Sequence, residues 1–311
     1  MKTISIIVPT YNQSAGIYEF YRRLKLVLNS LHNIYCYEII FINDFSIDDT
    51  LLSLYELADR DNNVKVISFS RNFGNQIAIA AGIDACKGDA AIIIDDDLQD
   101  PPELIPSLIQ KWSEGYEVVY GYRPKRHGIN IFFNLTTKAY YFLISKLSEV
   151  EIPRDTGDFR LIDKKVIDVL RKIKENSRYY RGIISWVGFK QFPFQYERDA
   201  RYSGKSNFTF RKYVSFGING LSSFTDKPLY FSSIIGALIT VISFIGMLVL
   251  IGLKIIDPSI ALRGWTSLAI LILFFGGVQL LSIGILGIYI GQIYHEVKNR
   301  PLYIIDSTKN L

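Results

Sequence analysis

Cysteine and histidine are scarce in this sequence of 311 residues, which contains 2 cysteines and 3 histidines. Cys36 and Cys86 have neither the spacing of a metal-binding motif nor that of a disulfide framework, and we interpret them as reduced thiols. His32, His127 and His295 show no pairing that is typical of catalysis. We therefore expect the histidines to be structural or surface residues.

Glycine-rich phosphate motifs are also missing. Neither G-x-G-x-x-G nor a P-loop occurs, which disfavours a dinucleotide site and a Walker-type site. The net charge of +5 is modest and gives little support to nucleic-acid binding. The chain enters an apolar run directly, without the long hydrophobic region or small-residue cleavage site of a signal peptide, so we expect no cleaved signal.

Charge is nearly absent after Pro228. The run 229–253 is uncharged and about 25 residues long, ample for a bilayer, and a second uncharged run follows at 265–291. Buried core helices are the alternative, but soluble core helices are seldom uncharged over more than about 18 residues. Because backbone polar groups in lipid must be satisfied internally, we predict two transmembrane helices, 229–253 and 265–291.

Two spans place both chain ends on the same side of the membrane. The basic residues beside the spans are Arg211, Lys212, Lys227, Lys298 and Arg300 outside the hairpin, and Lys254 and Arg263 in the link. The positive-inside rule then places the N-terminal part and the tail, 292–311, in the cytoplasm. The sequence thus predicts a multi-pass protein of the cytoplasmic (inner) membrane.

Apolar residues also recur at three- and four-residue steps just before the first predicted span, at Val214, Ile218, Leu221 and Phe224. This spacing predicts an interfacial amphipathic helix over 211–228. Glycines along the second span permit close helix packing, and we expect a homo-oligomer. They are Gly276, Gly277, Gly284, Gly287 and Gly291.

The first two thirds of the chain alternate between apolar runs and helical patterns. Strands are predicted at 4–8, 38–42, 64–69, 90–94 and 118–121, with helical stretches between them, such as 50–58 and 76–85. This alternation predicts an α/β domain over 1–210, with a mainly parallel, doubly wound sheet and helices on both faces. In such sheets ligands bind at the carboxyl ends of the strands.

Polar residues gather at those strand ends. PTYN follows the first strand at 9–12, NDFS the second at 43–46, and DDD the fourth at 95–97. Adjacent carboxylates repel each other unless a cation neutralises them, and Mg²⁺ or Mn²⁺ takes few carboxylates plus substrate phosphate oxygens. The alternative is an acidic loop that caps the helix beginning near Pro102.

Several motifs, in a fixed order, extend this pattern. They are VPTYN at 8–12, NDFS at 43–46, RNFG at 71–74, DDDLQDPPE at 95–103, DTGDFR at 155–160, RYSG at 201–204 and GQIYHEVKNRPLY at 291–303. The chain resembles the polyprenyl-phosphate glycosyltransferases of the inverting GT-A fold, including dolichol-phosphate mannose synthases and bactoprenol glucosyltransferases. The resemblance covers essentially the whole chain and implies a GT-A domain followed by a membrane hairpin.

The resemblance implies roles for residues of these motifs. Donor-binding positions are Pro9, Tyr11, Asn12, Asp44, Asp95 and Asp96. The divalent metal would be held by Asp95, Asp97 and Gln99. Asp158, Asp97 and Arg201 match catalytic positions. Arg160 and Arg198 lie at positions that the resemblance places near the donor diphosphate or the acceptor phosphate. Independently of the resemblance, the positive charge of Arg123, Arg126 and Lys205 makes these residues further candidates for binding the two phosphates.

The acceptor chemistry can be argued from the charges alone. A lipid phosphate is already an anion at neutral pH, so it needs positive charge near it rather than a general base. Arginine pairs with phosphate bidentately and suits this task, although such residues could equally be solvated charges or contact anionic lipid headgroups. We expect one in-line displacement with inversion, in which Asp158 orients the sugar or stabilises positive character at the ring.

The predicted function is transfer of a hexose, glucose from UDP-glucose, to polyprenyl (undecaprenyl) phosphate at the cytoplasmic membrane face. A GDP-sugar is the less favoured donor. One alternative is a membrane glycosyltransferase with a carbohydrate acceptor, for which Asp158 could serve as base. The predicted hairpin is too small for a polymer channel, however, and the Q-x-x-R-W signature of processive synthases is absent. Another alternative is a non-catalytic nucleotide-sugar-binding membrane module.

Overall fold

The structure is a computed structural model and describes residues 1–123, 156–175, 178–197, 227–256 and 265–311. The chain divides into two compact units. The first contains the α/β part together with the last residues, 300–311, and the second contains the two long C-terminal helices. Each unit is described by itself below.

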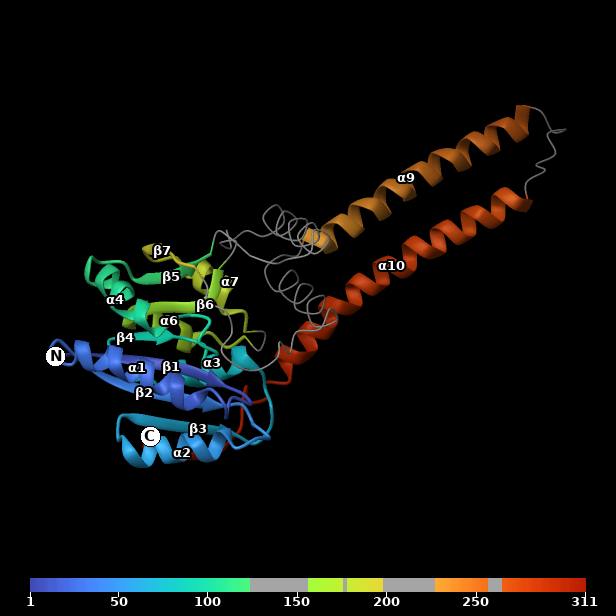
Figure 1. Cartoon of the computed structure of the whole chain (residues 1–311). Coiled ribbons are helices and arrows are strands. Elements are labelled where there is room, and N and C mark those ends of the chain that lie inside the picture. The colour runs from blue at the N-terminus through green and yellow to red at the C-terminus, as the bar shows by residue number, and fades with distance from the viewer. Residues whose placement is uncertain (124–155, 176–177, 198–226, 257–264) are drawn as a thin grey trace. The chain divides into compact units, whose positions relative to one another are not determined.

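A mixed sheet forms the centre of the first unit (Figure 1). Over the described residues it has eight strands in the order β7-β5-β6-β4-β1-β2-β3-β8. The strands are β1 (Lys2–Thr10), β2 (Tyr35–Asn43), β3 (Val64–Phe69), β4 (Ala90–Ile93), β5 (Val118–Tyr122), β6 (Thr156–Asp163), β7 (Gln191–Gln195) and β8 (Ile305–Lys309). The first five match the strands predicted from the apolar runs.

The middle of the sheet is parallel, as predicted. β4, β1, β2 and β3 are neighbours and run in the same direction. β6 pairs antiparallel with both β4 and β5, β7 pairs parallel with β5, and β8 pairs antiparallel with β3. Because β4, β1 and β2 are parallel neighbours, the polar residues that follow them meet at one edge of the sheet.

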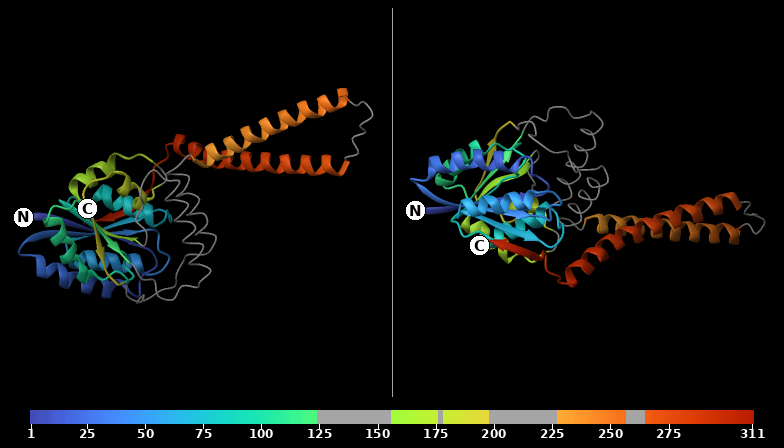
Figure 2. Two further views of the ribbon diagram at one scale, coloured as in Figure 1. Left: turned by 90° about the horizontal axis from the view of Figure 1, so that it is seen from above. Right: turned by 60° about the horizontal axis from the view of Figure 1, so that its bottom comes forward.

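Helices cover both faces of this sheet (Figure 2). They are α1 (Ile17–Leu31), α2 (Thr50–Arg60), α3 (Asn75–Ala85), a 3₁₀ turn η1 (Pro102–Leu104), α4 (Ile105–Ser113), α6 (Lys164–Lys172) and α7 (Tyr180–Trp186). Apolar residues of α1, α2 and α4 share one core with Ile4, Ile6 and Val8 of β1. Ile7, which alternation directs to the opposite face, meets α3 instead.

A glycine allows α3 to pack tightly on the sheet. A Cβ at Gly82 would lie 2.3 Å from Cγ2 of Ile7 and 3.0 Å from Cδ1 of Ile42. Both of these side chains are fully buried, so neither can easily move aside. Gly82 therefore sets the distance between α3 and the strands, and with it the position of the residues at the beginning of α3.

The end of the chain returns to the sheet as an edge strand. β8 pairs with β3, so the C-terminus lies beside β3 and α2 (Figure 1). At the end of this strand Asn310 Nδ2 donates hydrogen bonds to the carbonyls of Ala58 and Val64, and Lys309 pairs with Asp59. The segment predicted only as a cytoplasmic tail, 292–311, thus contains the end of α10 and a strand of the sheet.

The second unit consists of α9 (Lys227–Ile256) and α10 (Trp265–Val297). Within α10, Phe274–Tyr294 is long and apolar enough to cross a membrane. In α9 the apolar stretch Ile234–Gly246 is shorter than a span, so one of the two predicted spans is supported over the described residues. Residues 211–226 of the predicted interfacial helix lie outside the described residues.

Candidate active site

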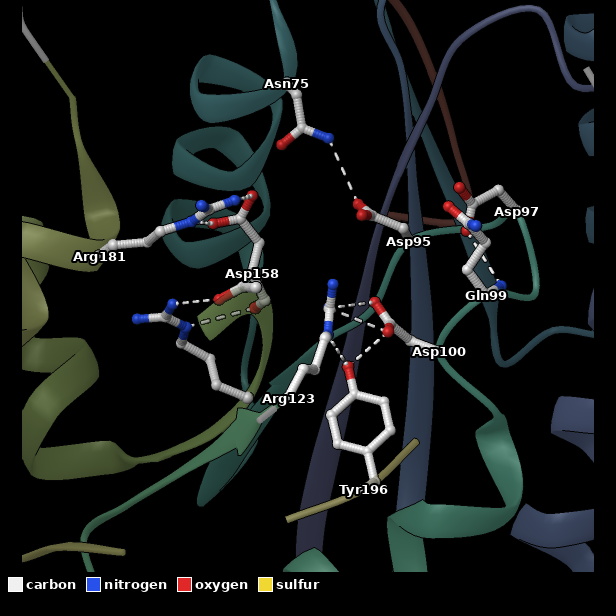
Figure 3. A network of polar contacts seen from close by, with 11 residues as sticks. Asn75, Asp95, Asp97, Gln99, Asp100, Arg123, Asp158, Arg181 and Tyr196 are labelled. Carbon is white, nitrogen blue, oxygen red and sulfur yellow. Dashed lines mark hydrogen bonds and ion pairs between the residues drawn. The ribbon is translucent and has the colours of Figure 1, made fainter. Parts of the chain in front are cut away.

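The carboxyl ends of β4, β1 and β2 bring together the polar segments that the sequence singles out. Thr10 at the end of β1 is in register with Asn43 at the end of β2, and Ile7 is in register with Ile93 at the end of β4. The acidic run therefore begins beside the residues that follow β1. Figure 3 shows Asp95, Asp97 and Gln99 in this region, with Asp158 across from them.

Asp95 is the half-buried member of the acidic run. Asn75, the first residue of α3, donates a hydrogen bond from Nδ2 to Oδ1 of Asp95 over 3.3 Å. Asp97 is buried, and its Oδ1 accepts a hydrogen bond from the backbone N–H of Gln99 over 3.1 Å. This local bond closes a turn at Leu98, whose φ of 59° is in the left-handed region.

Asp96 is the most deeply buried of these three residues, with 6% of its surface exposed. Burial, and after it the charge of Asp95, raises the pKa of Asp96 well above its usual value, although hydrogen bonds from Thr10 and Gln13 act against this. Its Oδ2 has no hydrogen-bond partner among the described residues. A carboxyl in this position favours either a proton or a nearby cation.

The described residues contain no group of three or more His, Cys, Asp or Glu side chains arranged to hold a metal ion. The predicted donor set is smaller, with the carboxylates of Asp95 and Asp97 and the amide of Gln99. Mg²⁺ commonly binds through one or two carboxylates and completes its shell with water and substrate phosphate. The crowded carboxylates and the unpartnered Oδ2 of Asp96 fit an ion that binds together with a phosphate ligand.

Asp158, in β6, is held by an arginine that lies outside the sequence motifs. Arg181 of α7 donates from Nε to Oδ1 over 2.9 Å and from Nη2 to Oδ2 over 3.1 Å. Gln76 of α3 adds a bond of 3.3 Å from Nε2 to Oδ2. Burial raises the pKa of Asp158, but the charge of Arg181, with help from Arg160, outweighs it and lowers this pKa to about 2.

Arg160, predicted to contact a phosphate, lies inside the domain with 3% of its surface exposed. Its Nη2 donates to the carbonyl of Gly157 over 2.7 Å and its Nε to the carbonyl of Asp158 over 3.3 Å. Burial lowers the pKa of Arg160 to about 10, so it still carries its charge at neutral pH. It therefore supports the backbone at Asp158 and adds positive potential there.

Arg123, also predicted to bind phosphate, is engaged with the acidic loop. Its Nη2 lies 3.0 Å from Oδ2 of Asp100, and its Nε donates to the Tyr196 hydroxyl over 2.6 Å. Tyr196 in turn donates to Oδ1 of Asp100 over 2.5 Å. A Cβ at Gly157 would lie 2.0 Å from Nη2 of Arg123, so the bare glycine leaves room for the guanidinium. The group joins the acidic loop to the ends of β5 and β7 (Figure 3).

The residues predicted to hold the nucleoside lie beside a second loop, at 70–74. Asp44 is buried, and its two carboxylate oxygens accept hydrogen bonds from the backbone N–H groups of Phe73, over 2.6 Å, and Gly74, over 2.8 Å. Burial raises the pKa of Asp44 despite these bonds. Asp44 therefore fixes the loop between β3 and α3.

Asn12 connects the loops that follow β1 and β2. Its backbone N–H donates to Oγ of Ser46 over 3.0 Å, and its Oδ1 accepts from the backbone N–H of Ile47 over 2.9 Å. Pro9 is buried within β1, whereas Tyr11 exposes 37% of its surface at the edge of the sheet. Of these predicted donor-binding residues, Tyr11 is thus the one whose ring can reach a ligand most directly.

The remaining predicted site residues lie outside the described part of the chain. They are Arg126, Arg198, Arg201 and Lys205. Among the described residues, sequence reasoning missed Asn75, Gln76 and Asp100 as partners of the site. Asn75 and Gln76 directly follow the RNFG motif, and Asp100 lies inside the acidic motif, so their positions in the sequence were the available signal.

Known proteins are similar to this chain in sequence. The family model described as "Glycosyl transferase family 2" matches residues 5–171. "Uncharacterized glycosyltransferase YkcC" of Bacillus subtilis (strain 168) is 45% identical over 304 residues, which cover 98% of this chain and 93% of that protein. "SfII prophage-derived bactoprenol glucosyl transferase" of Shigella flexneri is 41% identical over 303 residues, with 97% of each chain covered.

A more distant similarity extends to solved structures. Glucosyl-3-phosphoglycerate synthase from Mycobacterium tuberculosis, in complex with UDP, glucosyl-3-phosphoglycerate and Mn²⁺, is 19% identical with a TM-score of 0.48. The matched region covers 71% of this chain and 79% of that one. A likeness at this level carries no argument about ligands.

Proposed function

The chain belongs to glycosyl transferase family 2 and is a glycosyltransferase with the GT-A fold, and on this premise we propose that it transfers glucose from UDP-glucose to polyprenyl (undecaprenyl) phosphate with inversion. The similarity to a bactoprenol glucosyl transferase extends over 97% of both chains, which supports a lipid carrier and glucose together. A GDP-sugar donor is the less favoured choice.

One observation in the site favours a phosphate acceptor over a hydroxyl acceptor. A hydroxyl group needs a general base whose pKa is close to the working pH. Asp158 has a pKa of about 2 because Arg181 holds both of its oxygens, so it is a weak base at neutral pH. A phosphate monoester is already an anion there and attacks without losing a proton. The geometry therefore supports lipid phosphate better than a carbohydrate.

In the proposed reaction, a lipid-phosphate oxygen forms a bond to the anomeric carbon of glucose. The bond from that carbon to the diphosphate breaks on the opposite face, and the electron pair leaves with UDP, which inverts the configuration. Asp158 stays ionised and orients the sugar or stabilises positive character at the ring. Arg181 and Gln76 keep its carboxylate in place while this occurs.

The donor diphosphate would bind at the acidic run with a divalent ion, Mg²⁺ or Mn²⁺. Asp95 and Asp97 would hold the ion, with Gln99 adding to its shell, and Asn75 orients Asp95 through its hydrogen bond. The bound ion would offset the negative charge that develops on the leaving diphosphate. The nucleoside would bind beside Tyr11, Asn12 and Asp44, and the buried Asp96 would lie beneath the ligand.

Acceptor binding would depend on basic residues at the same edge. Arg181 and Arg160 supply positive potential beside Asp158. Arg126, Arg198, Arg201 and Lys205 are proposed to pair with the two phosphate-bearing substrates, since arginine binds phosphate bidentately. Arg123 contributes through its ion pair with Asp100, which holds the acidic loop in place.

The membrane arrangement is proposed as follows. Both α9 and α10 cross the bilayer, which places the two ends of the chain on the same side. The basic residues beside the spans favour the cytoplasmic face of the inner membrane for these ends. The apolar stretch Phe274–Tyr294 within α10 is long enough for one span, and the span in α9 is proposed from the uncharged run 229–253 of the sequence. The small residues of α10 suit association of several copies, so we propose a homo-oligomer.

The test is transfer of radiolabelled sugar from a panel of nucleotide sugars into organic-extractable lipid phosphate by the full-length chain. We expect label from UDP-glucose in the lipid phase, loss of label with EDTA, and recovery when Mg²⁺ or Mn²⁺ is added back. Asp97→Asn should abolish transfer, whereas the matched surface variant Asp168→Asn should not. The proposal would be overturned if label appeared in a carbohydrate fraction, or if no donor gave a labelled product.

A further inference from the structure

The end of the last sequence motif, NRPLY, has no role in the site described so far, and the structure brings it against the RNFG loop. RNFG forms the loop after β3, and NRPLY, the end of the last motif, leads into β8. The backbone N–H of Ser70 donates to the carbonyl of Ile304 over 3.0 Å, and Phe69 is in register with Ile305. The start of β8 therefore lies against the start of the 70–74 loop.

Tyr303 makes the side-chain contacts at this junction. Its ring stacks on that of Phe69, with centroids 5.2 Å apart and the planes at 23°. Its hydroxyl donates to Oδ2 of Asp84, in α3, over 3.0 Å. Burial, followed by the charge of Asp84, raises the pKa of Tyr303, so the hydroxyl keeps the proton that it donates.

The contacts continue from Phe69 into the site. The rings of Phe69 and Phe73 meet edge to face with centroids 5.5 Å apart. The backbone N–H of Phe73 and that of Gly74 donate to the two carboxylate oxygens of Asp44. Gly74 has a φ of 98°, which only glycine adopts readily, so the backbone turn that presents its N–H to Asp44 needs glycine at this position. Tyr303 and Asp44 are thus linked through two aromatic rings.

The second contact of Tyr303 leads to the same site through α3. Asp84, which accepts its hydrogen bond, is near the end of α3. The first two residues of that helix, Asn75 and Gln76, hold the carboxylates of Asp95 and Asp158. A rigid helix transmits a shift at one end to the other, so Tyr303 also acts on the contacts that α3 makes with Asp95 and Asp158.

We propose that Tyr303 is a positioning residue for nucleotide-sugar binding, which acts by fixing the 70–74 loop and α3. The inference rests on the proposed function in so far as the site binds a nucleotide sugar. It gives the C-terminal strand a role in substrate binding. This strand, β8, follows the apolar helix α10 in the chain, and residues 298–304 connect the two. Release of β8 from β3 loosens Asp44 and lowers the affinity for the donor.

The opposite end of β8 offers a matched control. Lys309 is in register with Val66, pairs with Asp59 and lies over the ring of Tyr55, all remote from the 70–74 loop. Lys309→Ala therefore removes a contact of the same strand without touching the path to Asp44. Tyr303→Ala removes both the ring and the hydroxyl, and Tyr303→Phe removes the hydroxyl alone.

The experiment uses the full-length chain in detergent and two readouts that need no acceptor. Hydrogen exchange of a peptide covering residues 70–76 reports on the loop, and equilibrium binding of UDP with Mg²⁺ reports on the donor site. We expect Tyr303→Ala to speed exchange in this peptide and weaken UDP binding about tenfold. Lys309→Ala should match the wild type in both readouts. Tyr303→Phe should fall between them, and it carries the test if Tyr303→Ala does not fold.

Unchanged exchange and binding in Tyr303→Ala, or equal changes in Tyr303→Ala and Lys309→Ala, would overturn the inference. Failure of the proposed function looks different, because the wild type would then transfer no label to lipid. The exchange comparison would still decide whether Tyr303 fixes the loop.

Discussion

Asp158 and Arg181 form a bidentate ion pair across two elements of the site, with Nε–Oδ1 and Nη2–Oδ2 distances of 2.9 and 3.1 Å. The pair is largely buried, with side-chain exposures of 25% for Arg181 and 12% for Asp158. A carboxylate held in this way keeps its charge and its orientation. In the proposed reaction it acts on the sugar as a fixed anion, and the acceptor brings its own negative charge.

Arg181→Gln tests this arrangement by removing the charge and keeping a polar side chain. We expect kcat to fall roughly 10- to 100-fold, because a catalytic group that is displaced by about 1 Å commonly costs that much. The control is Arg60→Gln, at an exposed residue on α2. An unchanged kcat in Arg181→Gln would show that the ion pair does not position Asp158 for the reaction.

The same variant has a predicted signature in the pH dependence of stability. The lowered pKa of Asp158 contributes stability that is complete above the usual value of about 4 and is lost as the pH falls toward 2. Without Arg181 the pKa rises, so this contribution shrinks. The melting temperature of Arg181→Gln should therefore fall less than that of the wild type between about pH 5 and pH 3. A steeper fall would contradict the account.

Gly82→Ala should destabilise the first unit. The added Cβ would lie 2.3 Å from Ile7, which is fully buried, so the helix or the strand must shift. Overpacking of this kind costs about 1–3 kcal/mol and lowers the melting temperature by several degrees. Gly246→Ala in α9, where nothing lies within 4 Å of the new Cβ, is the control. Equal melting temperatures for the two variants would show that α3 tolerates a larger separation from the sheet.

Asp44→Asn should weaken donor binding selectively. The amide has one acceptor oxygen, so one of the backbone N–H groups of Phe73 and Gly74 loses its partner. An unpaired buried donor costs about 1–3 kcal/mol, and we expect the KM for the nucleotide sugar to rise about tenfold. The KM for the lipid should stay within twofold, as it should in the surface variant Asp168→Asn. Parallel increases in both KM values would refute a donor-specific role.

Tyr196→Phe tests whether the Arg123–Asp100 pair orders the acidic loop. The variant removes two hydrogen bonds from this pair and keeps the ring against Phe159. We expect a 3- to 10-fold loss in kcat/KM for the donor, in line with about 1 kcal/mol for a hydrogen bond. Tyr18→Phe, whose hydroxyl meets Glu56 on the surface, should be silent. A rise confined to the KM for the lipid would indicate that Arg123 binds the acceptor phosphate instead of ordering the acidic loop.

The parts of the fold that the sequence predicted are those with a strong local signal. The runs that became β1 to β5 are buried on both faces and therefore nearly continuous in apolar residues. β8 has the sequence IDSTK, which is polar because an edge strand faces solvent, and its partner β3 is distant in the chain. β6 was visible only as the motif around Asp158, since its antiparallel pairing depends on tertiary contacts.

The candidate site likewise contains residues that the sequence predicts and residues that it does not. Asp44, Asp95 and Asp97 could be found because acidic residues directly after apolar strands are conspicuous. The partners that set their geometry could not, because Asn75, Gln76 and Arg181 reach the site only once α3 and α7 have packed. Arg123 was predicted as a phosphate ligand from its charge, and its neighbour Asp100 is apparent only in three dimensions.

The most direct test of the central claim compares two acceptors that differ only in the phosphate. Purified full-length chain, Mg²⁺ and labelled UDP-glucose are incubated with undecaprenyl phosphate or with undecaprenol of the same chain length. Since Asp158 is held as an anion and is a weak base, the account predicts label in the phosphate alone, with none in the alcohol. Label in undecaprenol at a comparable rate would contradict it and would require a general base at this site.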